Sequence, residues 1–239
     1  MIPFFVNFFY PFLSFSYKIE MVIFMIKAIL FDFDGVICDT EPINFNYKLE
    51  KMHEMGFPVT KEFLLSRVGE SFSVMFPREF PHVENPQKYV KEYYSGYKKA
   101  HRDYKSILYP EVPELLKYCK QNNITCVIAS NSNHARLEKA VKEIELEEYF
   151  YKLYSNEKLK VSKPNPLFYT KVVEDLGLNK DEVLVIEDSV HGIEAAVHAG
   201  LFTIAKKEYF FNLDQSLANI QIDKHTEVID IIEQKNKAE

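Results

Sequence analysis

Short apolar runs alternate with amphipathic stretches over most of the chain after residue 25. The runs are continuous rather than alternating in polarity and are rich in β-branched residues, which is typical of strands buried on both faces of a parallel sheet. The predicted strands are "IKAILF" (26–31), "ITCVIAS" (124–130), "EVLVIEDS" (182–189) and "LFTIA" (201–205).

The stretches between these strands carry apolar residues at helical spacing. The predicted helices of this part of the chain cover 112–123, 134–150, 165–178 and 191–200. In the third of them Asn165, Pro166 and Gly177 stand where the start and stop signals of a helix are expected. Alternating strands and helices predict an α/β fold with a doubly wound, mostly parallel, Rossmann-like sheet covered by helices on both faces.

One segment after the first strand breaks this alternation, because it contains no convincing strand. Helices are predicted there over 42–56, 60–69 and 85–105. Pro77, Pro81 and Pro86 mark a loop between the last two helices. We therefore predict a second, helical domain inserted into the first. The predicted domains are 25–40 with 107–239 for the core and 41–106 for the helical insertion.

Residues 1–24 fit neither pattern. The stretch "MIPFFVNFFYPFLSFSY" is apolar but carries Pro3, Asn7 and Pro11. It lacks the positive region and cleavage site of a signal peptide, and it is shorter than the ~20 residues of a spanning helix. Three interpretations stay open: a loosely packed extension, a mis-assigned start with Met21 or Met25 as the first residue, and a membrane-associating segment.

Composition narrows the class of protein further. The 239 residues suffice for a large domain, or for a core with an insertion. A net charge of -6 gives no indication of nucleic-acid binding. The cysteine number is odd (three) and no C-x-x-C pair occurs, so we expect free thiols in a reducing compartment rather than disulfides or a zinc site. A cytoplasmic monomer is the expectation.

Polar residues follow the predicted strands at the points where these end. They are Asp32 and Asp34 after the first strand, Ser130 at the end of the second, and Glu187 and Asp188 at the end of the third. Lys163 stands just before a predicted helix start. Ligands of open parallel sheets bind at the carboxyl edge of the strands, so we expect these side chains to meet there.

The chemistry of these residues fits phosphoryl transfer. Carboxylates gathered in one pocket repel one another, and oxygen ligands favour a hard divalent cation such as Mg²⁺. Period-two spacing places Asp32 and Asp34 on one side of the chain, so that one can attack phosphorus while the other, with a raised pKa, protonates the leaving group. Ser130, Asn131 and Lys163 would surround the phosphoryl oxygens, with the N–H groups of the following helix.

This arrangement resembles the haloacid dehalogenase superfamily of phosphotransferases. Its four motifs have counterparts in the family's order: "FDFDGV", "IAS" ending at Ser130, "SKPNP" with Lys163, and "VIEDSVHGI". The resemblance extends from Met25 to about Ile232, and the inserted helices are similar to the cap of the subgroup that includes the beta-phosphoglucomutases.

The resemblance implies a role for each matching residue. Asp32 would be the nucleophile that forms a phosphoaspartate, and Asp34 the acid/base. Ser130 and Lys163 would hold the phosphoryl group, with Asn131 beside them. The implied metal ligands are Asp32, Asp34 through its backbone carbonyl, Asp188, and Glu187 directly or through a water.

The second aspartate and the cap indicate which reaction to expect. Dehalogenases of the superfamily lack an aspartate at the position of Asp34, so phosphate ester chemistry is favoured. Family mutases carry a cap histidine and a cap arginine where Asn44 and Phe72 stand here. We therefore predict a Mg²⁺-dependent phosphatase acting on a small phosphorylated metabolite such as a sugar phosphate. A phosphomutase stays open, because Arg67 or Arg78 could replace the missing arginine.

The cap loop "VGESF" supplies the candidate specificity residues Glu70, Ser71 and Phe72. Phe72 would favour an apolar or stacking contact over a second anionic group. A different class of function, a non-catalytic binding protein on the same fold, is the remaining alternative. Turnover of a generic phosphate ester with Mg²⁺ would separate the two classes.

Overall fold

The computed structural model describes residues 25–68, 70–99 and 102–237. Residues 1–24, with their three interpretations, lie outside the described residues. Among the described residues, no helix combines the length and apolar composition needed to cross a bilayer.

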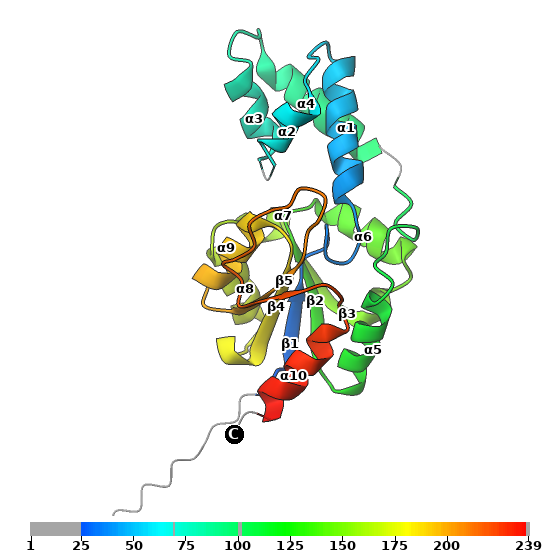
Figure 1. Cartoon of the computed structure of the whole chain (residues 1–239), viewed down its shortest axis with the longest axis vertical. Helices are drawn as coiled ribbons and strands as arrows, with labels where there is room; N and C mark the ends of the chain where they lie inside the picture. Colours follow the sequence, from blue (N-terminus) through cyan, green and yellow to red (C-terminus); the bar gives the residue numbers. More distant parts are fainter. Residues whose placement is uncertain (1–24, 69, 100–101, 238–239) are drawn as a thin grey trace, which may run out of the picture.

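The parallel strands of the described residues form one sheet within the larger, lower part of the molecule (Figure 1). The strands are β1 (Ala28–Phe31), β2 (Thr125–Ser130), β3 (Phe150–Ser155), β4 (Val183–Glu187), β5 (Phe202–Lys206) and β6 (Ile220–Ile222). Their order in the described sheet is β3-β2-β1-β4-β5-β6, and each neighbouring pair is parallel. The predicted doubly wound α/β fold is confirmed.

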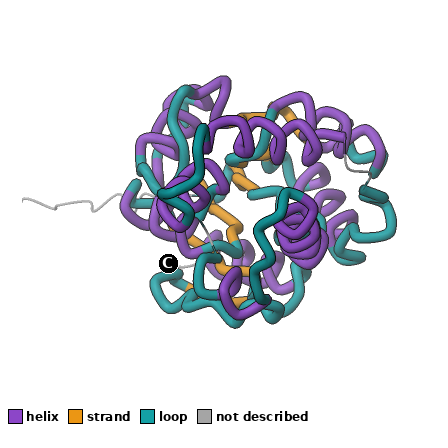
Figure 2. The backbone as a smooth tube through the Cα atoms, turned by 90° about the horizontal axis from the view of Figure 1, so that it is seen from above, coloured by secondary structure: helices purple, strands orange, loops and turns teal. Residues whose placement is uncertain are grey.

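Helices cover both faces of this sheet, as the view from above shows (Figure 2). The helices of the core are α5 (Val112–Gln121), α6 (His134–Glu143), α7 (Asn156–Leu159), α8 (Leu167–Leu176), α9 (Val190–His198) and α10 (Glu227–Lys237), with short 3₁₀ turns at Glu147–Tyr149 and Lys180–Glu182.

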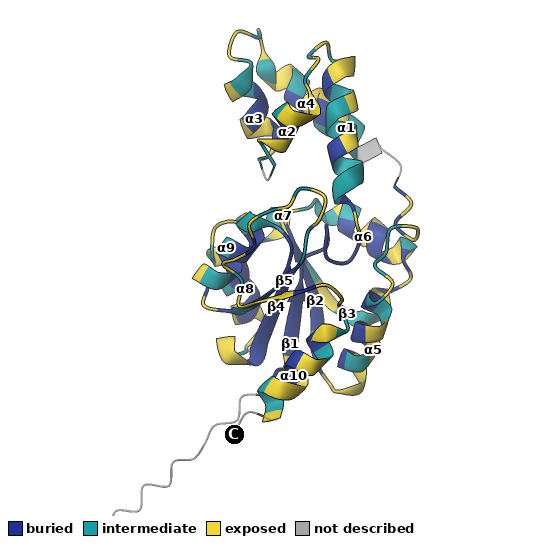
Figure 3. Ribbon diagram, viewed as in Figure 1, coloured by how far each residue is buried: buried dark blue, intermediate teal, exposed yellow. Residues whose placement is uncertain are grey.

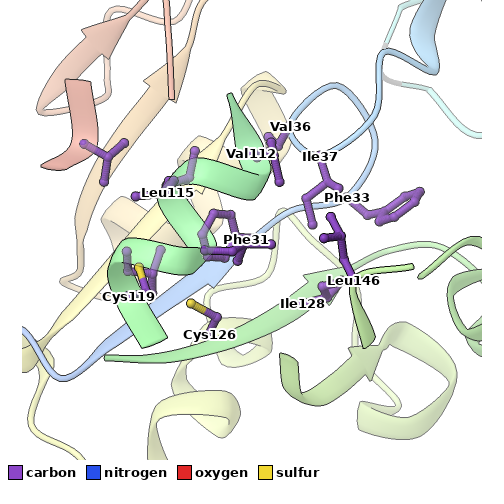
Figure 4. Close-up of a cluster of buried hydrophobic side chains, with 14 of the residues drawn as sticks. Phe31, Phe33, Val36, Ile37, Val112, Leu115, Cys119, Cys126, Ile128 and Leu146 are labelled. Carbon is purple, nitrogen blue, oxygen red and sulfur yellow. The ribbon is translucent and has the colours of Figure 1, made fainter. Parts of the chain in front are cut away.

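Alternate residues of each strand contact opposite helix layers. Ile29 and Phe31 of β1 face α5, α6 and α10, whereas Ala28 and Leu30 face α8 and α9. Figure 4 shows Phe31 packed beside Leu115 and Cys119 of α5. The central strands are buried throughout (Figure 3). This two-sided burial explains why their sequences read as unbroken apolar runs.

A separate group of helices lies beyond the carboxyl ends of the strands (Figure 1). We call it the cap: α1 (Glu41–Glu54), α2 (Lys61–Leu65), α3 (Phe72–Glu79) and α4 (Pro86–Lys99). The cap has a hydrophobic cluster of its own, distinct from the clusters that cover the sheet, with Phe45, Met52, Phe76 and Tyr93 among its buried residues. An inserted helical cap is therefore part of the fold, while the predicted boundaries at 41 and 106 stay predictions.

The chain enters and leaves the cap through adjacent segments. Asp39 N–H donates to the carbonyl oxygen of Ile107 at 2.8 Å, and Tyr109 N–H donates to that of Ile37 at 3.1 Å. Cys38 and Leu108 thereby form an isolated antiparallel bridge. The two connections of the cap are thus hydrogen-bonded to each other where they meet the core.

The structure corrects two local predictions. The helix predicted over 134–150 ends at Glu143, because Glu145 adopts a left-handed conformation (φ 59°), and the last predicted residue, Phe150, begins β3. The loop predicted around Pro77 is instead part of α3. Phe72, Met75 and Phe76 of this short helix are buried in the cap cluster, and that packing outweighs the proline.

Candidate active site

The sheet order brings the ends of β1 and β4 together. Asp32 follows β1 and its N–H donates to the carbonyl oxygen of Ile186 in β4 at 2.9 Å. Carboxylate oxygens of Asp32, Glu187 and Asp188 consequently lie within 4.8 Å of one another, and all three residues are buried. Chain connections run in opposite directions from this pair of strands, which is where doubly wound sheets form a binding crevice.

Lys163 is the cation at this edge. Its side chain is 3% exposed, and its Nζ lies 2.5 Å from both Asp32 Oδ1 and Glu187 Oε1. Burial lowers its pKa, but the Asp32 and Glu187 carboxylates outweigh burial and raise the pKa well above its usual range. Lys163 is therefore charged and bound to the predicted nucleophile.

Asn131 fixes the backbone of Lys163. Its Oδ1 accepts from Lys163 N–H at 3.0 Å, and its Nδ2 donates to the Lys163 carbonyl oxygen at 3.2 Å. The side-chain amide predicted to bind phosphate is thus used to position the lysine. Whether Asn131 also contacts a phosphoryl group stays a prediction.

Glu187 is saturated with protein donors. Besides Lys163, its Oε1 accepts from the Tyr169 hydroxyl at 2.9 Å, and its Oε2 accepts from Asp188 N–H at 3.0 Å and Ser189 Oγ at 3.1 Å. A Cβ added to Gly192 would lie 1.9 Å from Glu187 Oε1, so the helix backbone approaches this carboxylate closely. These contacts favour a supporting role, in which Glu187 orients Lys163.

Asp188 differs from its neighbours, because its carboxylate has no hydrogen bond or ion pair within the described part of the chain. Burial raises its pKa well above the usual range, and the Glu187 carboxylate adds to that effect. Gly35 (φ 79°) passes so close that a Cβ there would lie 1.9 Å from Asp188 Oδ2. An uncompensated buried carboxylate beside Asp32 fits a divalent cation.

Asp32 also titrates abnormally. Burial raises its pKa to about 7 against the opposing effect of Lys163, with the Glu187 carboxylate contributing to the rise. Lys163 alone therefore does not compensate the negative charge of Asp32 and Asp188.

Asp34 lines the same cavity as this pair, but its carboxylate is bound to Arg136 of α6. Its Oδ2 accepts from Arg136 Nη1 at 2.9 Å and Ser132 Oγ at 2.6 Å, and its Oδ1 accepts from Arg136 Nη2 and from Thr40 Oγ1 at 2.6 Å. Burial would raise the pKa of Asp34, but Arg136 and the hydroxyl donors lower it to about 2. The raised pKa expected from the sequence is not found in this arrangement.

Arg136 was missed by sequence reasoning. It contacts Asp34 across 102 residues of chain, and no motif connects the two. Its place follows from Asn133, whose side chain accepts from Arg136 N–H and caps α6 above the end of β2. The sequence contains this N-cap signal at Asn133, but the contact between Arg136 and Asp34 depends on the order of the strands in the sheet.

Two neighbouring cavities open above these groups. The inner cavity, of about 340 Å³, is lined by Asp32, Asp34, Ser130, Lys163 and Asp188 among others. The outer cavity, of about 500 Å³, lies between the cap and the core. The residues that line both are Glu41, Val68, Asn131, Ser132 and Phe211. The predicted catalytic, phosphate-binding and metal-binding side chains therefore face one space, apart from the saturated Glu187.

The predicted specificity residues Glu70, Ser71 and Phe72 line the outer cavity. Phe72 is 2% exposed and stacks on Tyr93 with 3.9 Å between ring centroids, so it belongs to the wall rather than projecting inward. Glu70 forms an ion pair with Arg78 at 2.8 Å.

The two arginines that could replace a mutase's cap arginine are occupied elsewhere. Arg67 pairs with Glu79 at 2.6 Å, and Arg78 pairs with Glu70 and Glu79. Neither is among the described residues that line the inner or outer cavity. Asn44 lines the outer cavity, and its Oδ1 accepts from Tyr97 Oη at 2.9 Å.

Known proteins are similar to this chain over most of its length. A phosphorylated carbohydrates phosphatase of Thermotoga maritima is 26% identical over 218 residues, which cover 87% of this chain and 99% of that protein. Hexitol phosphatase B of Escherichia coli is 27% identical over 210 residues, which cover 85% and 94% of the two chains. A beta-phosphoglucomutase structure from Clostridium difficile is 25% identical, with a TM-score of 0.70 over 89% of this chain and 97% of that one.

The family model for haloacid dehalogenase-like hydrolases matches residues 29–206, about three quarters of the chain. That range includes the ends of β1, β2 and β4, the Lys163 loop and the whole cap. The predicted enzyme class, a hydrolase whose named relatives are phosphatases, is confirmed at this level. The chain belongs to the haloacid dehalogenase-like hydrolase family.

Proposed function

We propose that this hydrolase is a Mg²⁺-dependent phosphatase that acts on a small phosphorylated metabolite through a phosphoaspartate on Asp32. The observation that supports it most is the pairing of Asp32 with Lys163 at 2.5 Å beside the uncompensated carboxylate of Asp188. The proposed nucleophile Asp32, the cation Lys163 for the phosphoryl oxygens and the carboxylate of Asp188, unpaired within the described residues, line the inner cavity together. The named phosphatase relatives support the same reaction.

Asp32 and Asp188 would hold the Mg²⁺, with the backbone carbonyl of Asp34 as the family resemblance implies. When bound, the ion neutralises charge on the transferring phosphoryl group. Lys163 and Ser130 bind the remaining phosphoryl oxygens, with the N–H of Asn131. The Asp32 carboxylate attacks phosphorus, and water then hydrolyses the acyl phosphate.

Asp34 would serve both halves of the reaction. Its pKa of about 2 leaves it ionised in the present arrangement, which suits removal of a proton from the attacking water. To protonate the leaving alkoxide, it must first leave Arg136 and take up a proton. The hydroxyl contacts of Thr40 and Ser132 would have to rearrange in the same movement.

The experiment is turnover of 4-nitrophenyl phosphate with Mg²⁺, with chelator, and in Asp32→Asn. We expect loss of at least about 10³-fold in the variant, because it removes the nucleophile, and loss of turnover with chelator. Asp39→Asn is the matched control, since Asp39 is an exposed aspartate of the same loop and should leave turnover unchanged. Undiminished turnover in folded Asp32→Asn would contradict the proposed nucleophile.

Phosphomutase activity is the alternative that the sequence left open. The absence of Arg67 and Arg78 from the described lining of both cavities favours hydrolysis. Incubation with β-glucose 1-phosphate and its bisphosphate separates the two, because a mutase would form glucose 6-phosphate faster than free phosphate. The cytoplasmic location and monomeric state expected from the sequence stay predictions.

A further inference from the structure

One face of α1 forms a wall of the outer cavity. Glu41, Asn44, Phe45 and Lys48 all line it, and their spacing of three, four and seven residues is that of a single helix face. The order along the face is an acid, an amide, an aromatic ring and an ammonium group. A ligand lying along α1 therefore meets a different chemistry at each end.

Lys48 is the cation at the far end of this face. It is half-buried, and no hydrogen bond or ion pair of its ammonium group is formed within the described parts of the chain. Burial lowers its pKa, although Glu41 and Glu70 oppose this effect. Lys51, one turn later, instead pairs with Glu54 at 3.1 Å and Glu92 at 3.2 Å and does not line the cavity.

The nearby acids do not neutralise Lys48 through a direct contact. Glu70 is in an ion pair with Arg78. Glu41 lies at the junction of the two cavities, and burial together with the Asp34 carboxylate raises its pKa to about 7. A partly desolvated ammonium group without a close partner is stabilised by an anion that enters the cavity.

Helix geometry sets the span between the two ends. Glu41 lines both cavities, whereas Lys48 lines only the outer one. Seven residues at 1.5 Å per residue place the two positions about 10 Å apart along the axis. That length corresponds to an extended chain of five or six carbons together with an anionic group at each end, and about 500 Å³ of cavity accommodates such a ligand.

We propose that Lys48 binds a second anionic group, a carboxylate or a phosphate, at the end of the substrate opposite the scissile phosphate. The inference rests on the proposed phosphatase function and narrows it to acidic phosphate monoesters. From the sequence, Phe72 of the cap loop predicted an apolar or stacking contact rather than a second anionic group. The ammonium group comes from α1, which lines the same cavity as the cap loop.

The test uses six-carbon monoesters that differ only at the far carbon. 6-Phosphogluconate carries a carboxylate there, glucitol 6-phosphate a neutral hydroxymethyl group, and glucitol 1,6-bisphosphate a second phosphate. We expect wild-type kcat/KM to favour at least one of the anionic compounds by roughly 10-fold or more, because a charge-assisted hydrogen bond forms with the ammonium group. The preferred compound identifies the anion.

Lys48→Gln should lower kcat/KM for the preferred anionic ester roughly 10- to 100-fold and for glucitol 6-phosphate less than about threefold. Lys48→Arg should restore most of the preference. Lys51→Gln is the matched control, since it removes the same charge from the same helix without touching the cavity. Equal losses on charged and neutral esters, or no wild-type preference for either anion, would overturn the proposal.

Two further measurements separate this inference from the proposed reaction. If 4-nitrophenyl phosphate is hydrolysed and charge selectivity is absent, only the Lys48 inference fails. If no ester is turned over, calorimetric measurement of ester binding to the Asp32→Asn variant still tests the Lys48 inference. Lys48→Gln in that background should weaken binding of the anionic ester roughly 10-fold or more and leave that of the neutral ester unchanged.

Discussion

Lys163 and Arg136 compensate different carboxylates of the site. Lys163 holds Asp32 together with Glu187, whereas Arg136 holds Asp34. Asp188 is left to the proposed metal. This division gives the proposed nucleophile Asp32 and the proposed acid/base residue Asp34 different cationic partners, although only Phe33 lies between them in sequence.

The Arg136–Asp34 contact should stabilise the fold. Replacing Arg136 by Gln leaves a largely buried carboxylate with hydroxyl donors alone, and we expect a loss of about 3 kcal/mol in the free energy of unfolding. Urea denaturation followed by circular dichroism measures it.

Arg78→Gln is the control for this prediction. Arg78 is 52% exposed and its ion pairs are screened by solvent, so unfolding should hardly change. In the double variant Asp34→Asn/Arg136→Gln the losses should be less than additive, because both remove one interaction. Additive losses would show that Arg136 stabilises the protein through other contacts.

Motif residues were predictable from sequence, and their partners were not. Asp32 and Asp188 directly follow strands and Lys163 lies in the loop before α8, so period and turn signals place them at one edge. Arg136 and Lys48 lie within helices, where the sequence pattern predicts which face of the helix a residue is on but not which residue it contacts. Their contacts depend on how segments that are distant in sequence pack together.

At the scale of elements, edge strands and short cap helices were harder to predict than the central sheet. β1 and β4 are buried throughout, so their sequences are uniformly apolar. β3 lies at the edge and has exposed Tyr151 and Lys152, so it lacks the unbroken apolar run of a central strand, and the helix predicted over 134–150 included its first residue, Phe150. α3 owes its existence to packing in the cap rather than to its own propensity.

The segment before α10 is joined to the loop after β1 by a buried histidine. His225 is fully buried and its Nε2 lies 2.7 Å from the carbonyl oxygen of Val36. Burial lowers the pKa of His225 to about 4, against the opposing hydrogen bond to Val36. The imidazole is therefore neutral in the folded protein over the whole physiological range, with its Nε2–H donating to Val36.

This histidine predicts a loss of stability in mild acid. Below pH 6.5 the unfolded chain binds a proton at His225 that the folded chain does not, so the free energy of unfolding falls as pH drops toward 4. The contribution of this residue reaches about 3 kcal/mol. His225→Gln keeps a donor for Val36 and should flatten the dependence in urea denaturation between pH 7 and 4.

His198→Gln is the matched control, because it removes an exposed imidazole from the last turn of α9. It should leave the acid dependence as in the wild type. An unchanged slope in His225→Gln would mean that other groups govern unfolding in this range.

At the scale of the whole molecule, an aromatic contact joins the cap to the core. Phe45 of α1 lies 5.6 Å, centroid to centroid, from both Phe210 and Phe211 of the loop after β5. Phe211 lines both cavities, whereas Phe210 lines neither. Phe210 is therefore the residue with which cap attachment can be tested apart from substrate contact.

Phe210→Ala should loosen the cap without affecting the sheet. Loss of one aromatic pair is expected to speed amide hydrogen exchange in the cap by up to about tenfold and to leave exchange in β1 and β4 unchanged. Tyr209→Ala is the control, since Tyr209 is 70% exposed and bonds to Asp223 instead. Equal exchange in both variants would show that Phe210 does not hold the cap.

The paired connections at Ile37–Asp39 and Ile107–Tyr109 have a consequence for how such an enzyme diversifies. The inserted helices have their own hydrophobic cluster, and their two ends start from neighbouring points of the core. The cap can therefore be replaced or altered as one unit without changing how the strands of the core sheet pair. Natural variation can then alter the choice of metabolite while the phosphoryl chemistry is inherited intact.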